Sequence, residues 1–418
     1  MAQQQTLIGP FTQLITMRGI PTSGPIKDTK IEVIPRAGVI VQGGKITDLG
    51  KYQDLLETWD QHKGTIEEIK EPLVAIPGLV DPHTHICWAG SRHHDFSMRL
   101  EGMSYQDISQ AGGGIWSTVL LTRAAILDDL VNNTRERAGE SLKNGITTIE
   151  VKSGYGLNLE SELKMLEAVF NANKLIPVDL IPTCLAAHIL PRDFSGSAEE
   201  YLDSMVDNLL PEVKRQKLSN RIDIYVDEHA FEAAQAKKYL AKARDMGFDL
   251  VVHADQFKRG GVELAVAMGA RSADHLESST DKEIKMLAES NTMAIALPGA
   301  SVGLGEPFTP ARKLLDEGAS LAIGSDWNPG SAPMGDLLVQ ASILAVYEKL
   351  TIAEILAGIT TRAAYALHLN DRGVLDRGKI ADFAAFPVND YQEIFYNQGR
   401  VKPCRVWKNG KQVLSTCD

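Results

Sequence analysis

The chain has little cysteine, no block of basic residues and no long apolar run, and each absence excludes a class of protein. Its four cysteines among 418 residues lie far apart, without CxxC spacing or the density of a disulfide scaffold, which favours a reducing compartment. The net charge of −11, with no Lys/Arg cluster, argues against nucleic acids and anionic membranes as partners. The apolar runs fall far short of the ~20 residues that span a bilayer.

The amino terminus reads Met-Ala-Gln-Gln-Gln-Thr, without a basic segment followed by an apolar one. We therefore expect no signal peptide and a cytoplasmic protein. Hydrophobic residues make up 44% of the chain and charged residues 23%, the balance of a globular protein that can bury a large core. This length suits one large α/β barrel with a smaller module beside it.

The central part of the chain alternates short β-like runs with longer amphipathic segments. The eight β-like runs are Leu73–His85, Gly145–Ser153, Val178–His188, Ile222–His229, Phe248–Gln256, Ala270–Glu277, Thr292–Ala300 and Ser320–Pro329. Between them, segments such as Glu160–Ala172 and Ala233–Met246 carry apolar residues at helical spacing. Eight alternations predict a (β/α)8 barrel of the TIM type over residues 73–370, although the pattern also fits an open parallel sheet.

The two flanks differ from the centre in that they contain short β-like runs around glycine turns. Residues 1–72 include the runs Ala37–Gly43 and Lys45–Leu49, and residues 371–418 include Asn409-Gly410, a strong hairpin signal. We expect these flanks to form one small composite β-sandwich module, with its two parts contributed by the two ends of the chain.

Polar residues gather where the predicted strands end, which is where the active site of such a barrel is assembled. His83 and His85 are two residues apart, so on an extended strand both side chains leave from one face. Later runs end in His188, in His253-Ala-Asp-Gln256, in Asp274-His275-Leu-Glu277 and in Ser325-Asp326. Five of the ten histidines therefore occupy matching positions, which favours a site over isolated structural histidines.

Histidines together with one carboxylate are typical of a hydrolytic centre around one divalent metal ion, which lowers the pKa of a bound water from ~15.7 to ~7. We assign His83, His85, His253 and Asp326 as the ligands. Asp326 has a second, catalytic role in this hypothesis, proton transfer, although Ser-Asp-x-Asn-Pro is also good turn chemistry. His275 would lie across the metal and polarise the carbonyl oxygen of the substrate. The alternative interpretation of His275 is a buried histidine with a structural role.

Two motifs resemble the amidohydrolase superfamily: PGLVDPHTH at 77–85 and GSDWNPG at 324–330. These motifs are shared by many deaminases and cyclic amidases. A narrower resemblance, to the imidazolonepropionase family, rests on segments that run through the whole predicted barrel: GSRHHDFSMRLEGMSYQDISQAGGGIWSTV at 90–119, EVKSGYGL at 150–157, LAAH at 185–188, HADQF at 253–257, SADHLE at 272–277 and SDWNPGSAP at 325–333.

The resemblance implies metal-dependent hydrolysis of the ring amide of 4-imidazolone-5-propanoate to N-formimino-L-glutamate, in histidine degradation. It implies one zinc ion, with iron as the alternative, and a homodimer. The expected substrate-binding residues are Arg92, Tyr105, Tyr155, His188, Gln256, Asn328, Gly330 and Ser331. Among them, Arg92 can bind the propanoate carboxylate through two hydrogen bonds.

Gln256 departs from the glutamate that many related deaminases have three residues after this histidine. A glutamine side chain has no titrating proton, so it argues against a mechanism that needs the glutamate and leaves proton transfer to Asp326. We interpret Lys152 as a supporting hydrogen-bond or ion-pair group. Two alternatives stay open: a deaminase or cyclic imidase acting on another heterocycle, and a metal-free barrel used for binding.

Overall fold

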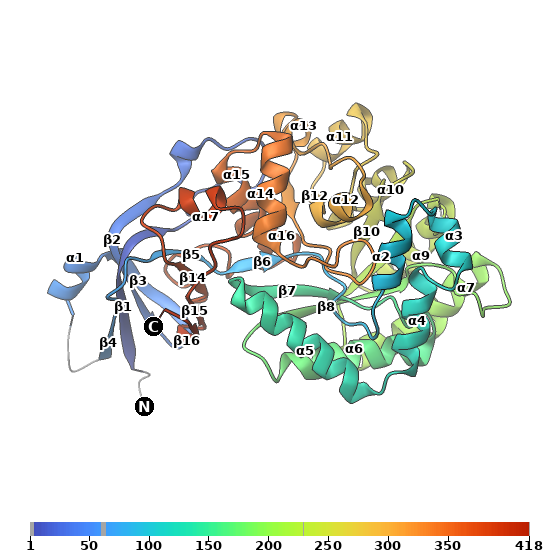
Figure 1. Cartoon of the computed structure of the whole chain (residues 1–418), viewed down its shortest axis with the longest axis horizontal. Helices are drawn as coiled ribbons and strands as arrows, with labels where there is room; N and C mark the ends of the chain where they lie inside the picture. Colours follow the sequence, from blue (N-terminus) through green and yellow to red (C-terminus); the bar gives the residue numbers. More distant parts are fainter. Residues whose placement is uncertain (1–3, 60–63, 229, 418) are drawn as a thin grey trace.

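The structure is a computed structural model that describes residues 4–59, 64–228 and 230–417, apart from the side chains of Tyr105, Gln106 and Ser109. Eight strands pair in parallel in the order β13-β12-β11-β10-β9-β8-β7-β6 and curve into a barrel (Figure 1). They are β6 (Leu79–Asp81), β7 (Ile146–Lys152), β8 (Asp179–Ala187), β9 (Arg221–Val226), β10 (Asp249–Ala254), β11 (Ser272–His275), β12 (Met293–Ala296) and β13 (Leu321–Ile323). The predicted TIM-type barrel is confirmed.

The barrel closes between its first and last strands, at the point where two predicted ligand segments meet. Thr84 and Trp327 form an isolated parallel bridge just beyond β6 and β13. The carbonyl of His83 accepts a hydrogen bond from the backbone N–H of Asp326 at 2.9 Å. Backbone pairing therefore brings residues from the two ends of the barrel sequence into contact before any side chain is considered.

Helices follow the barrel strands and cover the outside of the barrel (Figure 1). Those after β6 to β9 are α2 (His93–Leu100), α3 (Tyr105–Gln110), α4 (Ile115–Ala124), α5 (Leu127–Lys143), α6 (Leu159–Asn173), α7 (Ala198–Ser204), the π-turn η2 (Met205–Leu209), α8 (Leu210–Arg215) and α9 (Ala233–Asp245). Those after β10 to β13 are α10 (Gly261–Met268), α11 (Asp281–Ala288), α12 (Pro298–Leu304), α13 (Ala311–Asp316), α14 (Leu337–Glu348), α15 (Ile352–Gly358) and α16 (Thr361–Ala366). Helices α6 and α9 confirm the two segments predicted from periodicity.

A second, mainly antiparallel sheet is built from both flanks, in the order β16-β15-β14-β5-β1-β2-β3 with β4 beside β1. Its strands are β1 (Gln5–Ile15), β2 (Val33–Gln42), β3 (Lys45–Lys51), β4 (Gly64–Glu68), β5 (Val74–Pro77), β14 (Phe383–Phe386), β15 (Arg405–Lys408) and β16 (Lys411–Ser415). Of the short helices in the flanks, α1 (Tyr52–Glu57) packs against β2 and β3, whereas η1 (Asp28–Lys30) contacts α15 and α17 (Gln392–Tyr396) contacts α14. Asn409 and Gly410, with φ of 50° and 70°, make the predicted hairpin turn between β15 and β16.

The first predicted strand run, Leu73–His85, is divided between the two sheets. Its beginning, β5, pairs with β14 and β1 in the second sheet, and only β6 belongs to the barrel. The chain is extended and apolar on both sides of Gly78, so the sequence pattern alone cannot show where one sheet ends. The domain boundaries at residues 72/73 and 370/371 stay predictions.

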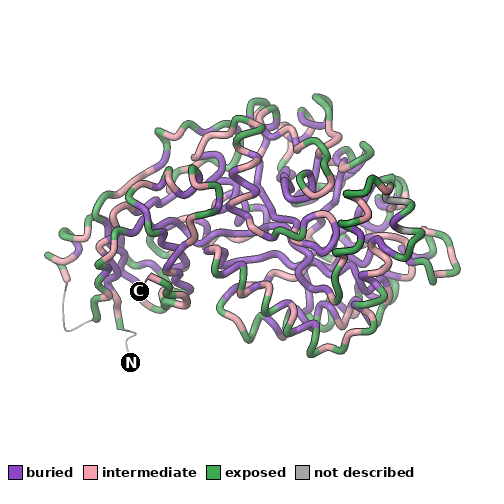
Figure 2. Tube along the Cα trace, in the orientation of Figure 1, coloured by how far each residue is buried: buried purple, intermediate pink, exposed green. Residues whose placement is uncertain are grey.

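The second sheet and the barrel are in contact through buried residues. Most residues of the barrel strands are buried, as are β5 and β14 of the second sheet, and Figure 2 shows the central strands largely in purple. Lys408 on β15 crosses between the sheets, with its Nζ 2.5 Å from Asp382 and 2.7 Å from Asp179 on β8. These contacts link β15 of the second sheet to β8 of the barrel.

Cys404 and Cys417 form a disulfide with their Cα atoms 5.2 Å apart, whereas Cys87 and Cys184 are free and buried. The sequence spacing gave no sign of this bond, because the approach of the two residues depends on the folding of β15 and β16. Among the described residues, we find no helix of the length and apolar character that crossing a membrane requires. The cytoplasmic location stays a prediction.

Candidate active site and metal centre

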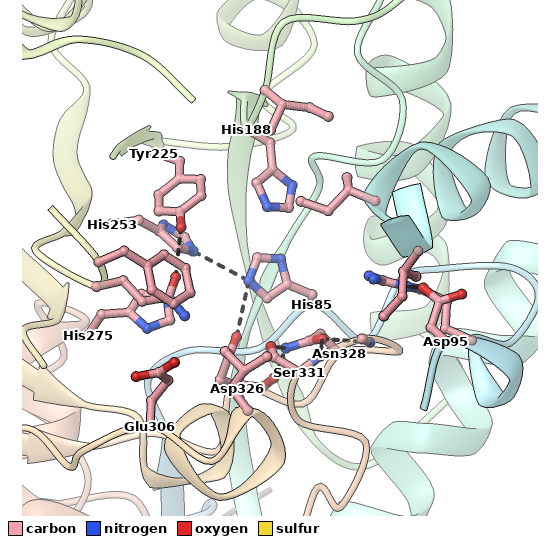
Figure 3. A pocket seen from close by; sticks show the side chains of 18 of the residues that line it. His85, Asp95, His188, Tyr225, His253, His275, Glu306, Asp326, Asn328 and Ser331 are labelled. Carbon is pink, nitrogen blue, oxygen red and sulfur yellow. Dashed lines mark hydrogen bonds and ion pairs between the residues drawn. The ribbon is translucent and has the colours of Figure 1, made fainter. Parts of the chain in front are cut away.

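Three predicted histidine ligands meet at the carboxyl end of the barrel strands. Nε2 of His85 lies 3.3 Å from Nε2 of His83 and 3.4 Å from Nε2 of His253. Oδ1 of Asp326 lies 3.4 Å from Nε2 of His83 and 3.3 Å from Nε2 of His85. Figure 3 shows His85, His253 and Asp326 directed toward one another at the floor of a pocket. The histidine ring nitrogens form a group that could hold a metal ion.

The spacing of these atoms fits a small divalent cation. Four ligands at about 2.0–2.1 Å from a tetrahedral ion are themselves about 3.3–3.4 Å apart, which matches the observed separations. The other nitrogen of two rings faces a carboxylate: Nδ1 of His83 lies 2.6 Å from Asp274, and Nδ1 of His253 lies 3.0 Å from Asp223. A proton on each Nδ1 directs the Nε2 lone pair at the common centre.

The protonation of the three rings differs. Burial lowers the pKa of His253 to about 3 and that of His85 well below its ordinary value. Burial and Lys152 also lower the pKa of His83, but hydrogen bonds with Asp274 and Asp326 outweigh them and raise it to about 9. The proton on Nε2 of His83 would therefore have to leave before that nitrogen could bind a cation.

Asp326 and His275 both occupy the left-handed region of backbone conformation, with φ of 50° and 88°. Such conformations cost ~1–3 kcal/mol for residues with a side chain and cluster at functional sites. Burial opposes ionisation of Asp326, but hydrogen bonds from His83 and His85 hold its pKa well below the ordinary value. Asp326 is thus a carboxylate at neutral pH, as proton acceptance requires.

The ring of His275 lies beside the centre, 5.4 Å from the ring of His253 between centroids. Its Nδ1 is 3.5 Å from the carboxylate of Glu277. Burial lowers the pKa of His275, but the Glu277 carboxylate outweighs burial and raises it above the ordinary value. This arrangement favours a proton on the ring and suits a hydrogen-bond donor.

A cavity of about 410 Å³ opens above the metal centre. Arg92 lines it, with Nε 2.7 Å from Asp95, and Arg99 lines it nearby and donates a hydrogen bond to the carbonyl of Gly330. A Cβ atom on Gly330 would lie 2.2 Å from Nη1 of Arg92, so only glycine lets this guanidinium pack there. The cavity thus has the histidine group that could hold a cation at its base and the guanidinium groups of Arg92 and Arg99 in its wall.

The loop after β7 and the end of β8 supply one side of the cavity. Tyr155 is buried against it, and His188 projects into it, as Figure 3 shows for His188. Nδ1 of His188 is 2.9 Å from the carbonyl of Gly154, and burial lowers the pKa of this histidine to about 4. Because Nδ1–H donates to that carbonyl, the neutral ring offers Nε2 as an acceptor.

Two amide side chains in the cavity have defined partners. The Tyr225 hydroxyl donates to Oε1 of Gln256 at 2.8 Å, which leaves the amide nitrogen of Gln256 as a donor. Oδ1 of Asn328 accepts the backbone N–H groups of Gly330 and Ser331, each at 2.8 Å. Asn328 therefore shapes the loop that carries these residues.

The structure places most of the predicted site around this one cavity. Its lining includes these predicted residues: His85, Arg92, Tyr155, His188, His253, Gln256, His275, Asp326, Asn328, Gly330 and Ser331. His83 lies beneath it at the centre, and the side chain of Tyr105, on α3, lies outside the described part of the chain. Sequence reasoning missed Tyr225, Arg99, Glu228 and Glu306 in the lining. Three of them had a usable signal: Tyr225 and Glu228 lie in the predicted strand run Ile222–His229, and Arg99 lies in the quoted segment 90–119.

Residues 74–413 match the amidohydrolase family. The imidazolonepropionase of Bdellovibrio bacteriovorus is 37% identical over 414 residues, which cover 98% of this chain and 97% of that protein. That of Bacillus cereus is 38% identical over 91% of this chain and 89% of its own length. That of Herpetosiphon aurantiacus is 39% identical over 96% of this chain and 97% of its own length.

Solved structures with a similar fold act on different molecules. Atrazine chlorohydrolase from Arthrobacter aurescens, complexed with zinc, has a TM-score of 0.71 at 18% identity, covering 98% of this chain and 95% of that chain. Ochratoxinase of A. niger has a TM-score of 0.71 at 16% identity, covering 100% of this chain and 97% of that chain. At these identities the likeness extends to the fold alone.

Proposed function

Because this chain belongs to the imidazolonepropionase family of the amidohydrolases, we propose that it hydrolyses 4-imidazolone-5-propanoate to N-formimino-L-glutamate, in histidine degradation. One observation of the structure carries the proposal: three histidine nitrogens and one carboxylate oxygen converge beneath a cavity that has Arg92 in its wall. The chain is accordingly a hydrolase acting on C–N bonds.

His83, His85, His253 and Asp326 would hold one divalent cation, and we propose zinc, since tetrahedral N/O ligation suits it. When bound, the cation supplies a Lewis acid that lowers the pKa of a water molecule at the open position. Iron accepts the same donors, so metal analysis of the purified protein decides between the two.

Asp326 and His275 provide the proton transfer and the polarisation. The Asp326 carboxylate accepts a proton from the attacking water as the C–O bond forms, and passes it to the ring nitrogen as the C–N bond breaks. His275 donates a hydrogen bond to the carbonyl oxygen and stabilises the charge that develops on it. Gln256 takes no part in proton transfer, because an amide does not titrate.

The wall of the cavity supports recognition of an anionic substrate with a polar ring. Arg92 binds the propanoate carboxylate by charge-assisted hydrogen bonds. His188 and Gln256 offer an acceptor and a donor to the ring, and we propose that Tyr105 and Tyr155 add hydroxyl groups. The loop with Asn328, Gly330 and Ser331 completes the wall next to Arg92.

A turnover assay tests this function. The metal-loaded protein is given freshly generated 4-imidazolone-5-propanoate, a panel of other cyclic amides, and aminopurines. We expect turnover of the imidazolone propanoate at a kcat/KM of roughly 10⁴ M⁻¹s⁻¹ or more. Preferred turnover of an aminopurine or another cyclic amide would instead support a deaminase or imidase. A protein that binds no metal and hydrolyses none of these compounds would refute the proposal.

A further inference from the structure

Lys152 is a buried lysine beneath the metal centre, and the mechanism above does not use it. It ends strand β7, its side chain is 0% exposed, and it is absent from the lining of the cavity. An ammonium group removed from water is costly unless it is paired and hydrogen-bonded. The groups around Lys152 must therefore compensate for the loss of water around its ammonium group.

Three carboxylates from three barrel strands surround this ammonium group. Nζ of Lys152 lies 2.8 Å from Glu150, 2.8 Å from Oδ2 of Asp223 and 3.6 Å from Oδ2 of Asp274. Asp223 is on β9, Asp274 is on β11, and both are buried. One positive charge at the centre of the barrel thus holds together side chains that the chain separates by many residues.

The same two aspartate oxygens face the metal-binding histidines. Oδ2 of Asp223 is 3.0 Å from Nδ1 of His253, and Oδ2 of Asp274 is 2.6 Å from Nδ1 of His83. Each aspartate therefore stands between the ammonium group and one imidazole ring. Outer partners of this kind set the orientation of metal ligands.

Without the ammonium group, the negative carboxylates would repel one another in a region with little water to screen them. Asp223 and Asp274 would then be displaced from the histidines, and the rings would lose the partners that fix their orientation.

We propose that Lys152 is a positioning residue of the metal centre: it holds Asp223 and Asp274 so that His253 and His83 face a common cation. This inference rests on the proposed function, because it assumes that the histidines bind a metal ion. Lys152 touches neither the cation nor the substrate, and it acts through the two aspartates.

Zinc affinity tests this role separately from catalysis. The metal-free protein and its Lys152→Met variant are titrated with zinc against a chromophoric chelator, and the visible spectrum of the cobalt-loaded proteins is recorded. We expect the variant to bind zinc about 10–100-fold more weakly and its cobalt spectrum to change, since the ligand geometry is altered.

Lys408→Met is the matched control, because Lys408 is also buried between two carboxylates but lies on β15, outside the cavity lining. We expect it to reduce stability and to keep the zinc affinity and cobalt spectrum of the wild type. If Lys152 acts through Asp223, the double variant Lys152→Met/Asp223→Asn will bind zinc more tightly than the product of the two single effects predicts.

Where Lys152→Met does not fold, Lys152→Gln serves instead, because its amide can still hydrogen-bond to the carboxylates without carrying charge. A folded Lys152 variant with wild-type zinc affinity overturns the inference. So does failure of both variants to fold while Lys408→Met folds, since Lys152 would then serve the fold. A wild-type protein that binds no zinc refutes the proposed function itself.

Discussion

At the scale of single residues, the chemistry of this site depends on which groups are charged after burial. His85, His188 and His253 are held neutral by burial, whereas Asp326 stays ionised because two imidazoles face it. The surroundings of each titratable residue thus decide whether it is charged at neutral pH, and so which role it can take.

Asp326→Asn tests the assigned proton transfer. The amide cannot accept a proton, so we expect kcat to fall by at least ~100-fold while the fold is retained. Turnover is measured together with circular dichroism and zinc content, because Asp326 is also a proposed ligand. A zinc-loaded variant with substantial activity would contradict the role.

Arg92→Ala tests recognition of the substrate carboxylate. Loss of a charge-assisted pair of hydrogen bonds is worth ~1.5–3 kcal/mol, so we expect KM to rise roughly 10–100-fold with little change in kcat. Arg215→Ala, an exposed arginine on α8, is the control and should leave both constants unchanged. An unchanged KM in Arg92→Ala would place the carboxylate elsewhere, for example at Arg99.

His188 predicts a specific dependence of stability on pH. Its pKa is lowered from 6.5 to about 4 in the folded protein, so the unfolded chain takes up a proton between these values and the folded one does not. Stability is therefore lost as pH falls through this window, by up to roughly 3 kcal/mol from this one group. Denaturant titrations at pH 7 and pH 4 should show a smaller acid loss for His188→Asn, and an equal loss would contradict the assigned shift.

At the scale of elements, the loop that carries Tyr155 is positioned by helix α6. Oε1 of Glu162 accepts backbone hydrogen bonds from Gly156 and Leu157, each at 2.8 Å, within the buried start of this helix. A carboxylate that accepts several N–H groups at a helix start is favourably placed for the helix dipole as well. Through these hydrogen bonds, helix α6 holds the loop that carries Tyr155 in the cavity wall.

Glu162→Ala removes these acceptors and leaves buried N–H groups unpaired. We expect unfolding to become easier by ~1–3 kcal/mol or more, and KM to rise because Tyr155 moves. Glu160→Ala, at an exposed position on the same helix, is the control and should change neither quantity. Denaturant unfolding and steady-state kinetics measure the two effects. An unchanged KM would mean that Glu162 does not position Tyr155 for substrate binding.

At the scale of the whole molecule, the cation would join segments from opposite ends of the barrel sequence. His83 and His85 follow the first barrel strand, His253 lies near the end of the fifth and Asp326 follows the last. A ligand that binds only the folded state stabilises it by ~2.7 kcal/mol at 100 times its Kd.

Removal of the metal by a chelator should therefore lower the Tm, and added zinc should restore it. Differential scanning calorimetry at several zinc concentrations measures the effect. The Tm should rise with zinc concentration, because the shift follows mass action. A Tm that is independent of both chelator and zinc would mean that no cation connects these strands.

Much of this protein follows from the sequence alone. The periodicity of α6, the glycine turn of Asn409-Gly410 and the histidines at strand ends are local signals, and the structure has these three features where the sequence predicts them. The two motifs around His83 and Asp326 also indicated the amidohydrolase superfamily, because the residues of a motif lie within a few positions of one another.

Only the tertiary structure decided which distant residues meet. The division of Leu73–His85 between two sheets, the Cys404–Cys417 bond, and the cluster of Lys152 with Asp223 and Asp274 have no local signature. Strand pairing and barrel closure create these contacts, and they depend on how the whole chain packs. The sequence thus determined what each strand end carries, and the closed barrel determined what each of those groups faces.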